Sequence, residues 1–230
     1  MRSNRNGLKD RARVKAMAQA AGDSRLVVVD HALVQHKLTL MRAAETPPPL
    51  FRQLLRETAI LLAYEAMRVL PTKPKAVETP MGPTEGVKLT HPPAVVSILR
   101  AGNGLLDGLL DIVPSASVGF IGMYRDEESL QPVDYYLNLP SGLEERVTIV
   151  VDPMLATAGS AISAVEKLRE AGATDLRFMC LVAAPEGIER LQKAHPEVMI
   201  VTAAVDEGLN EIGYIVPGLG DAGDRIFGTE

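Results

Sequence analysis

The chain has 230 residues, of which 47% are hydrophobic, and its formal net charge is −5. This length allows one domain with a sizeable core, and the composition is typical of a globular protein. No apolar run approaches the roughly 18 residues of a membrane span. The N-terminus also lacks a secretory type of apolar stretch, so we expect a cytoplasmic protein with no membrane partner. A single cysteine, Cys180, excludes an internal disulfide.

Charge divides the chain into two parts. Residues 1–25 hold seven Lys or Arg and two Asp or Glu, a net charge of +5, so residues 26–230 carry −10. We therefore expect a mobile basic extension over 1–25 and one domain over 26–230. The acidic domain argues against nucleic-acid binding, although an arm that binds RNA or a protein partner stays open for the extension. The four histidines lack metal-ligand spacing, and we expect no zinc site.

The first ninety residues contain strand, helix and breaker signals in turn. Apolar spacing predicts a short strand at 26–29, a helix at 31–42 and a long helix at 51–70. We expect Pro47–Pro49 to interrupt regular structure. Residues 71–93 are rich in Pro and Gly, which indicates irregular strands and turns, interpreted as a separate flap.

From residue 94 onward, strands alternate with helices. We expect strands at 94–99, 117–123, 146–151, 176–183 and 198–204, a turn and short helix between 102 and 114, and helices at 161–170 and 186–194. The polar stretch 126–140 is interpreted as a hairpin arm and a candidate lid. This alternation is typical of an α/β protein with a parallel sheet covered on both faces. Ligands in such sheets bind beyond the carboxyl ends of the strands.

Residues 147–161 carry the most informative motif. A buried strand is followed by Asp152, then by a loop of small and hydroxyl residues, then by a helix. Backbone N–H groups of the loop, the positive end of the helix and the hydroxyls of Thr157 and Ser160 favour an anion such as phosphate. The loop is neither a Walker loop nor a dinucleotide fingerprint. An ordinary Ser/Thr helix cap is the alternative interpretation.

Charged side chains flank this motif. Asp152 is placed to accept hydrogen bonds from ribose hydroxyls or to orient waters on magnesium. Arg100 and Arg125 each follow an apolar strand, and guanidinium groups are suited to phosphate. A solvated Asp and two surface arginines in ion pairs are the alternative.

The C-terminal run 213–228 is dense in glycine. Gly218, Gly220 and Gly223 let the backbone turn sharply and approach a ligand, so its N–H and C=O groups match the edge of a small planar base. A disordered tail is the alternative, and apolar residues such as Ile215 and Leu219 argue against it.

Together these motifs resemble the uracil phosphoribosyltransferase family, from about residue 29 to residue 230. The matching segments are His36-Lys37-Leu38, Ile98-Leu99-Arg100-Ala101-Gly102, Gly122-Met123-Tyr124-Arg125, residues 151–160, residues 182–187 and residues 213–228. The resemblance implies a type I phosphoribosyltransferase fold, with a parallel-sheet core and a small hood that binds the base. It also implies transfer of the phosphoribosyl group of 5-phosphoribosyl 1-diphosphate (PRPP) to uracil, giving UMP and diphosphate in pyrimidine salvage.

The resemblance also assigns roles to residues. The PRPP-binding residues would be Arg100, Arg125, Asp152, Pro153, Met154, Leu155, Ala156, Thr157, Ala158, Gly159, Ser160 and Asp221, with Asp152 and Arg125 catalytic. The uracil-binding residues would be Ile215, Gly220, Asp221 and Ala222. Magnesium would arrive mainly bound to PRPP, without dedicated protein ligands. Some family members are activated by GTP, and the family forms dimers and tetramers.

Two residues depart from the family pattern. Ala158 replaces a usual glycine, and it would cost about 1 kcal/mol or more if the position needs a positive φ. Asn103 stands where an apolar residue is usual, and it would either alter the diphosphate contacts or face solvent. A phosphoribosyltransferase for another base, or a related regulator that binds nucleotides or RNA, remains the alternative function.

Overall fold

The computed structural model describes residues 25–125 and 132–229. Its main sheet has the strand order β1-β10-β9-β7-β4-β5-β6, with β8 added beside β9. The strands are β1 (Leu26–Val28), β4 (Ala94–Leu99), β5 (Ser117–Arg125), β6 (Pro132–Asn138), β7 (Val147–Val151), β8 (Met154–Leu155), β9 (Asp175–Ala183) and β10 (Met199–Val205). Within the described sheet every pair is parallel except β5 with β6. The α/β fold expected from the alternating pattern is confirmed.

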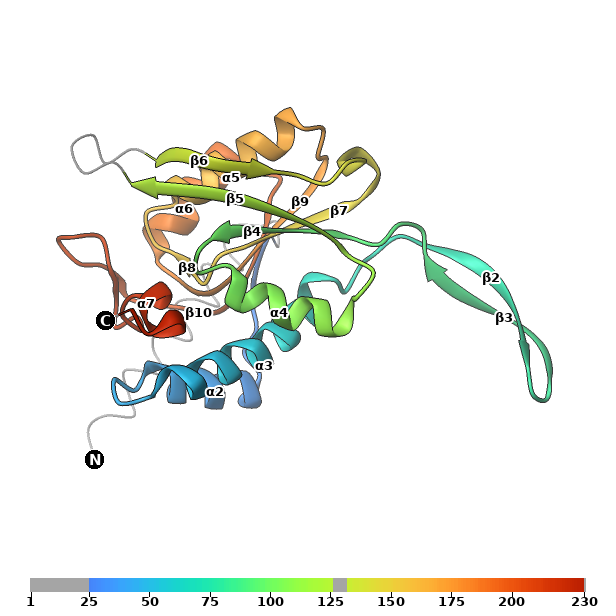
Figure 1. Cartoon of the computed structure of the whole chain (residues 1–230), viewed down its shortest axis with the longest axis horizontal. Coiled ribbons are helices and arrows are strands. Elements are labelled where there is room, and N and C mark those ends of the chain that lie inside the picture. Colours follow the sequence, from blue (N-terminus) through green and yellow to red (C-terminus); the bar gives the residue numbers. More distant parts are fainter. Residues whose placement is uncertain (1–24, 126–131, 230) are drawn as a thin grey trace.

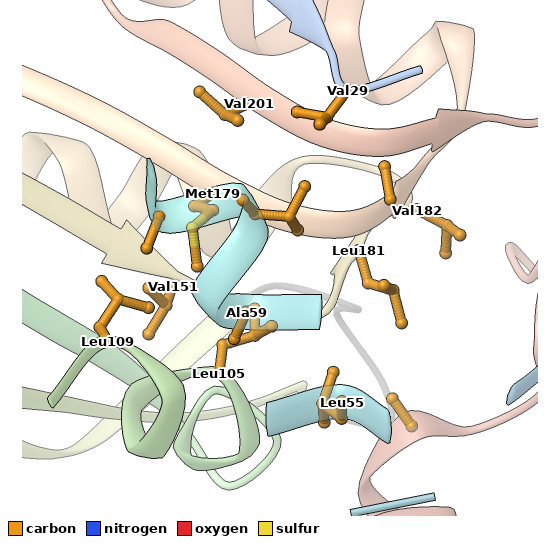
Figure 2. Close-up of a cluster of buried hydrophobic side chains, with 14 of the residues drawn as sticks. Val29, Leu55, Ala59, Leu105, Leu109, Val151, Met179, Leu181, Val182 and Val201 are labelled. Carbon is orange, nitrogen blue, oxygen red and sulfur yellow. The ribbon is translucent and has the colours of Figure 1, made fainter. Parts of the chain in front are cut away.

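Helices cover both faces of this sheet (Figure 1). One face is covered by α2 (Ala32–Arg42), α3 (Pro48–Ala66) and α4 (Asn103–Ile112), and the other by α5 (Gly159–Glu170) and α6 (Pro185–Ala194). Side chains along β9 alternate between the two cores: Met179 and Leu181 belong to the first, Phe178 and Cys180 to the second. Figure 2 shows the first core, where side chains of α3 and α4 meet those of the central strands. Burial on both faces explains why these strands read as continuous apolar runs.

The long helix differs from its predicted bounds. It begins at Pro48, whereas the sequence predicts a start at residue 51 and an interruption at Pro47–Pro49. Proline is favoured in the first turn of a helix, because the N–H it lacks would have no partner there. The helix ends at Ala66, before the predicted end at residue 70. The proline run therefore starts a helix and does not separate elements.

Residues 71–93 are more regular than expected. Strands β2 (Thr72–Thr79) and β3 (Gly82–Leu89) pair without interruption from Thr72↔Leu89 to Thr79↔Gly82. Figure 1 shows this hairpin as a long arm that projects away from the sheet. Each strand of a two-stranded ribbon has a free edge, so Pro74 and Pro83 are tolerated. The prediction of irregular structure is wrong, whereas a separate projecting element is present.

Of the hairpin arm expected at 126–140, the structure describes strand β6, which pairs antiparallel with the preceding strand β5; residues 126–131 lie outside the described residues. The basic extension also lies outside them, except for residue 25, so its separation from the domain stays a prediction. The glycine-rich end forms β12 (Ile215–Val216), paired with β11 (Gly208–Leu209), and α7 (Ala222–Phe227). A disordered tail is therefore excluded up to residue 229. No helix in the described ranges is long and apolar enough to cross a membrane.

Candidate active site

The predicted phosphate loop lies at the carboxyl end of β7 and is held by the neighbouring strand β9. The N–H of Asp152 donates to the carbonyl of Met179, at 3.2 Å, and the Pro153 carbonyl accepts from Leu181 and Val182. Met154 and Leu155 are not loop but strand β8, parallel to the end of β9. These bonds fix the entrance of the loop to the central strands.

Helix α6 supports the loop from behind. A Cβ built on Gly187 would lie 2.3 Å from the carbonyl oxygen of Ala156 and 2.6 Å from that of Leu155. No real Cβ approaches backbone this closely, so Gly187 is what allows α6 to press against the loop. This contact was not predicted, although Gly187 belongs to a segment that carries the family resemblance.

The start of α5 lies open to an anion. Its N-cap residue is Ala158, which makes no side-chain capping hydrogen bond. Neither Thr157 nor Ser160 therefore occupies the N-cap position. The first N–H groups of a helix lack partners within it, so those of Gly159 and Ser160 are available to a phosphate.

Ala158 adopts the left-handed conformation in which glycine is usual. Its φ is 63° and its ψ is 3°. Among the described residues, Ala158 is the only non-glycine residue with a positive φ. An L-residue pays roughly 1–2 kcal/mol there. Its methyl group is only 5% exposed and packs into the core under α5. Burial of one methyl offsets much of the strain, because a buried CH₂ group contributes about 0.8 kcal/mol.

Asp152 has an unusual protonation equilibrium. Its half-buried carboxyl group has a pKa of about 7, raised mainly by desolvation and further by the charge of Asp221, against a weak hydrogen bond from the Met154 N–H at 3.5 Å. Asp221 belongs to the glycine-rich C-terminal run. Perturbed carboxyl groups of this kind cluster at functional sites.

Arg100 lies where β4 ends and faces the C-terminal helix. Its side chain is exposed, with Nη2 3.7 Å from Oδ1 of Asp224 and Cζ 5.7 Å from the ring centre of Phe227. The exposed guanidinium is free to change its partner, since a surface ion pair contributes little. Arg125 is the last residue of β5, and its side chain lies outside the described part of the structure.

Asn103 does not merely face solvent, and its effect on the diphosphate contacts stays a prediction. It opens α4, and its Oδ1 accepts a hydrogen bond from the buried hydroxyl of Ser97, at 2.8 Å. The side chain therefore ties the loop after β4 to the strand itself. Ser97 pairs with Val151, the residue before Asp152, so this bond lies close to the phosphate loop.

The predicted base-binding residues lie on the hood, which we define as residues 206–228. Ile215 and Ala222 are buried, while Gly220 has a φ of 76° and Asp221 is exposed. Asp221 caps α7 by accepting the N–H of Asp224, at 3.0 Å. The hood also touches the phosphate loop, because a Cβ on Gly213 would lie 3.5 Å from Cγ2 of Thr157. The structure thus brings the two predicted motifs together.

Sequence reasoning missed the residues that hold the hood. Arg225 donates to the carbonyls of Met41, Leu219 and Ala43, and its guanidinium stacks on Phe51 at 4.6 Å. Asp206, which follows β10, pairs with Arg42. An acidic residue just beyond an apolar strand is the same signal that marks Asp152, so Asp206 could have been identified from the sequence.

Comparison with known proteins decides the family. Residues 28–229 match the family described as uracil phosphoribosyltransferase. The chain belongs to the uracil phosphoribosyltransferase family. A uracil phosphoribosyltransferase from Paracoccus denitrificans is 60% identical over 210 residues, which cover 89% of this chain and 98% of the relative. One from Brucella ovis is 58% identical over 206 residues, 89% of this chain and 99% of the relative.

A solved structure agrees with the family assignment. The AQ2163 protein from Aquifex aeolicus is 37% identical and has a TM-score of 0.84, covering 89% of this chain and 99% of that chain. The type I phosphoribosyltransferase fold implied by the family, with its sheet core and hood, is the fold observed. Across residues 25–125 and 132–229, no group of three or more His, Cys, Asp or Glu side chains is placed to hold a metal ion.

Proposed function

We propose that this chain transfers the phosphoribosyl group of PRPP to N1 of uracil, releasing UMP and diphosphate. The observation that carries the proposal is the uncapped start of α5 beside the half-buried carboxyl of Asp152, with the hood against it. A phosphate site and a carboxyl group side by side suit a sugar phosphate, which offers an anion to one and hydroxyl groups to the other. Membership of the uracil phosphoribosyltransferase family supports the same reaction.

The roles of individual residues follow from their positions. The N–H groups at 158–160 hold the ribose 5-phosphate, and Asp152 accepts hydrogen bonds from the ribose hydroxyls. Arg100 exchanges Asp224 for the diphosphate, a more highly charged partner. We assign Arg125 to the diphosphate as well, since β5 ends beside β4 at the same edge of the sheet. Pro153 to Thr157 shape the loop between these groups.

Departure of diphosphate from the anomeric carbon leaves positive charge on the ribose and negative charge on the leaving group. Arginine side chains preorganised around the leaving group stabilise this charge separation. Magnesium that arrives with PRPP supplies further positive charge to the diphosphate. The residues present fit such a ligand, because the charge of Asp221 contributes to the raised pKa of Asp152, and a nearby cation would offset that repulsion.

Uracil is read by the backbone of the hood at Ile215, Gly220, Asp221 and Ala222. Orotate is the base that the structure disfavours most clearly. Its carboxylate needs a cation, and Arg225, the arginine of the C-terminal run, is held by three carbonyl groups and the ring of Phe51. Burial lowers the pKa of Arg225, which reflects a guanidinium fixed within the protein.

The test is UMP formation from uracil, PRPP and magnesium, followed with radiolabelled uracil. Orotate and hypoxanthine serve as competing bases at the same concentration. We expect turnover with uracil alone. Turnover with another base and none with uracil refutes the substrate assignment, and binding of nucleotides or RNA without any turnover favours the regulator.

We propose that the active form is a homodimer or a homotetramer, with the β2–β3 arm packed on a second copy. The arm exposes Met81, Val87 and Val77, at 96%, 73% and 40% of their surface. A two-stranded ribbon is marginally stable alone in water, so it gains stability when a partner covers it. Sedimentation of the full chain and of a variant with Met81→Asp and Val87→Asp tests this: the variant is expected to sediment as a smaller species.

We also carry forward two expectations, one from the family resemblance and one from the sequence itself. GTP is expected to act as an activator, and sedimentation and initial rates with and without GTP test whether it changes assembly or turnover. A cytoplasmic location is the other expectation, which fractionation of the source cells tests.

A further inference from the structure

The backbone of Gly218 is clamped between two charged side chains from different elements. Arg42, the last residue of α2, donates from Nη1 to the Gly218 carbonyl, at 2.6 Å. The N–H of Gly218 donates to Oδ2 of Asp206, at 3.0 Å. Arg42 and Asp206 form a two-pronged ion pair, with N···O distances of 2.8 and 2.5 Å. Both polar groups of one hood residue are thus bound by one ion pair.

This ion pair is protected from water. The Asp206 side chain is 5% exposed and that of Arg42 is 24% exposed. Two-pronged pairing between a guanidinium and a carboxylate fixes orientation as well as distance. Asp206 is itself fixed, because its N–H donates to the carbonyl of Ala183 at the end of β9, at 2.9 Å. The clamp therefore connects the hood to the rigid carboxyl edge of the sheet.

The turn held by the clamp has little freedom of its own. Gly218 has a φ of 58°, and a Cβ there would lie 2.1 Å from the carbonyl oxygen of Ile215. The Val216 carbonyl accepts the N–H of Glu207, at 2.9 Å. Beyond the turn, Arg225 ties the Leu219 carbonyl to those of Met41 and Ala43. The proposed base-binding backbone is held just before Gly220 by two arginines, one at the end of α2 and one bonded to it.

We infer that Arg42 and Asp206 are positioning residues that set the backbone of 215–222 for recognition of uracil. The inference rests on the proposed function, in which this backbone reads the base. Backbone donors and acceptors cannot change rotamer to follow a displaced ligand, so their geometry must be set before the base arrives. Hydrogen bonds weaken steeply when distance or angle departs from the optimum. Neither Arg42 nor Asp206 needs to contact uracil for this role.

If the clamp has this role, variants that break it should bind uracil more weakly but bind PRPP as before. All the proposed PRPP-binding residues except Asp221 lie outside the segment that the clamp holds, whereas all the proposed uracil-binding residues lie on it. Arg42→Lys keeps the charge but replaces a planar fork with a single ammonium, which cannot bond Gly218 and both Asp206 oxygens together. We expect the KM for uracil to rise by about tenfold, with the KM for PRPP within about twofold of wild type.

A matched control is provided by Arg56 and Asp111. This pair is also two-pronged, with both N···O distances at 2.6 Å, but it is exposed and joins α3 to α4 without bonding the hood among the described residues. Arg56→Lys is expected to leave both KM values unchanged. Asp206→Asn provides a second test from the other side of the clamp, and it is expected to reproduce the selective rise in KM for uracil. Thermal unfolding of each variant shows how much folded protein is assayed.

The outcomes separate the inference from the proposed function. Wild-type enzyme without uracil turnover refutes the proposed function itself. An active wild type with an unchanged ratio of the two KM values in both clamp variants refutes the positioning role, because a merely structural ion pair lowers stability or both affinities together. If Arg42→Lys does not yield folded protein, the ratio measured for Asp206→Asn decides.

Discussion

The hydroxyl of Ser97 donates a hydrogen bond to Oδ1 of Asn103 across 2.8 Å, and so joins β4 to the first residue of the helix that follows it. Ser97 has no exposed surface, and water therefore cannot replace its partner. A buried hydroxyl left without a partner costs roughly 1–3 kcal/mol. The polar residue that departs from the family pattern at 103 is thus matched by a buried polar residue at 97.

This pairing predicts energetic coupling between the two positions. Asn103→Leu is expected to lower the free energy of unfolding by about 1–2 kcal/mol, since it strands the Ser97 hydroxyl. Adding Ser97→Ala is expected to restore much of that loss, because it removes both partners together. Urea unfolding of the two single variants and the double variant gives the coupling energy. Additive losses contradict the pairing.

Asp152 is expected to be required for turnover. Asp152→Asn keeps the size of the side chain but loses the charge that accepts hydrogen bonds from the ribose, so we predict that kcat/KM for PRPP falls by about 100-fold while the protein stays folded. In wild type, the pKa of about 7 predicts that kcat/KM falls as pH drops below 7, because the free enzyme then carries a protonated carboxyl. If the variant keeps wild-type rates, Asp152 is not part of the active site.

The same carboxyl group makes stability depend on pH. Its pKa in the folded protein is about 7, above the ordinary value of 3.8, so the folded state binds this proton more tightly than the unfolded state does. The stabilising contribution is complete below pH 3.8 and is lost as pH rises through 7. Asp152→Asn lacks this titration. Between pH 5 and pH 8, the free energy of unfolding of wild type should therefore fall by about 2 kcal/mol relative to that of the variant. This figure is reduced because the side chain is partly exposed.

Urea unfolding at pH 5 and pH 8 measures this gain. Asp175→Asn is a suitable control, since Asp175 begins β9 at the opposite edge of the sheet and has an exposed side chain. A constant difference between Asp152→Asn and wild type at both pH values contradicts the raised pKa.

The sequence was sufficient to predict the strands that are buried on both faces. An apolar run such as 94–99 has one explanation in an α/β protein, and the structure places β4 at those same residues. The arm was harder to predict, because the spacing of Pro and Gly in 71–93 is the same for loops and for a ribbon with two free edges. Local sequence does not encode which edge of a strand faces solvent.

The candidate site divides in the same way. The loop around Asp152 could be predicted because a buried strand, an acid and a helix follow one another within fifteen residues. The clamp could not, since Arg42 and Asp206 are 164 residues apart and meet only through the packing of α2 on β10. The left-handed backbone at 158 was anticipated from the resemblance, and the buried methyl that compensates for it was not.

Replacing Ala158 with a smaller or a larger residue is expected to have different effects. Ala158→Gly relieves the strained φ but loses a buried methyl and adds freedom to the unfolded chain, so stability is expected to change by less than about 1 kcal/mol. PRPP affinity is expected to stay within about threefold of wild type. Ala158→Val adds β-branching at the same φ and is expected to cost at least about 2 kcal/mol. Absence of PRPP binding in wild type, with binding restored by Ala158→Gly, would refute the phosphate role of the loop as it stands.

Gly187 provides the sharpest test of how the loop is supported. In Gly187→Ala, the new Cβ would lie 2.3 Å from the Ala156 carbonyl, which is backbone and cannot rotate away, so α6 and the loop must separate. We expect a loss of about 2 kcal/mol in stability and a rise of about tenfold in the KM for PRPP. The KM for uracil should change little, because the backbone around Gly218 is held by Arg42 of α2 and by Asp206, which follows β10. Glu189→Ala, on the exposed side of the same helix, is the control and should match wild type. If Gly187→Ala loses stability but keeps its KM for PRPP, the loop does not depend on α6 for its binding geometry.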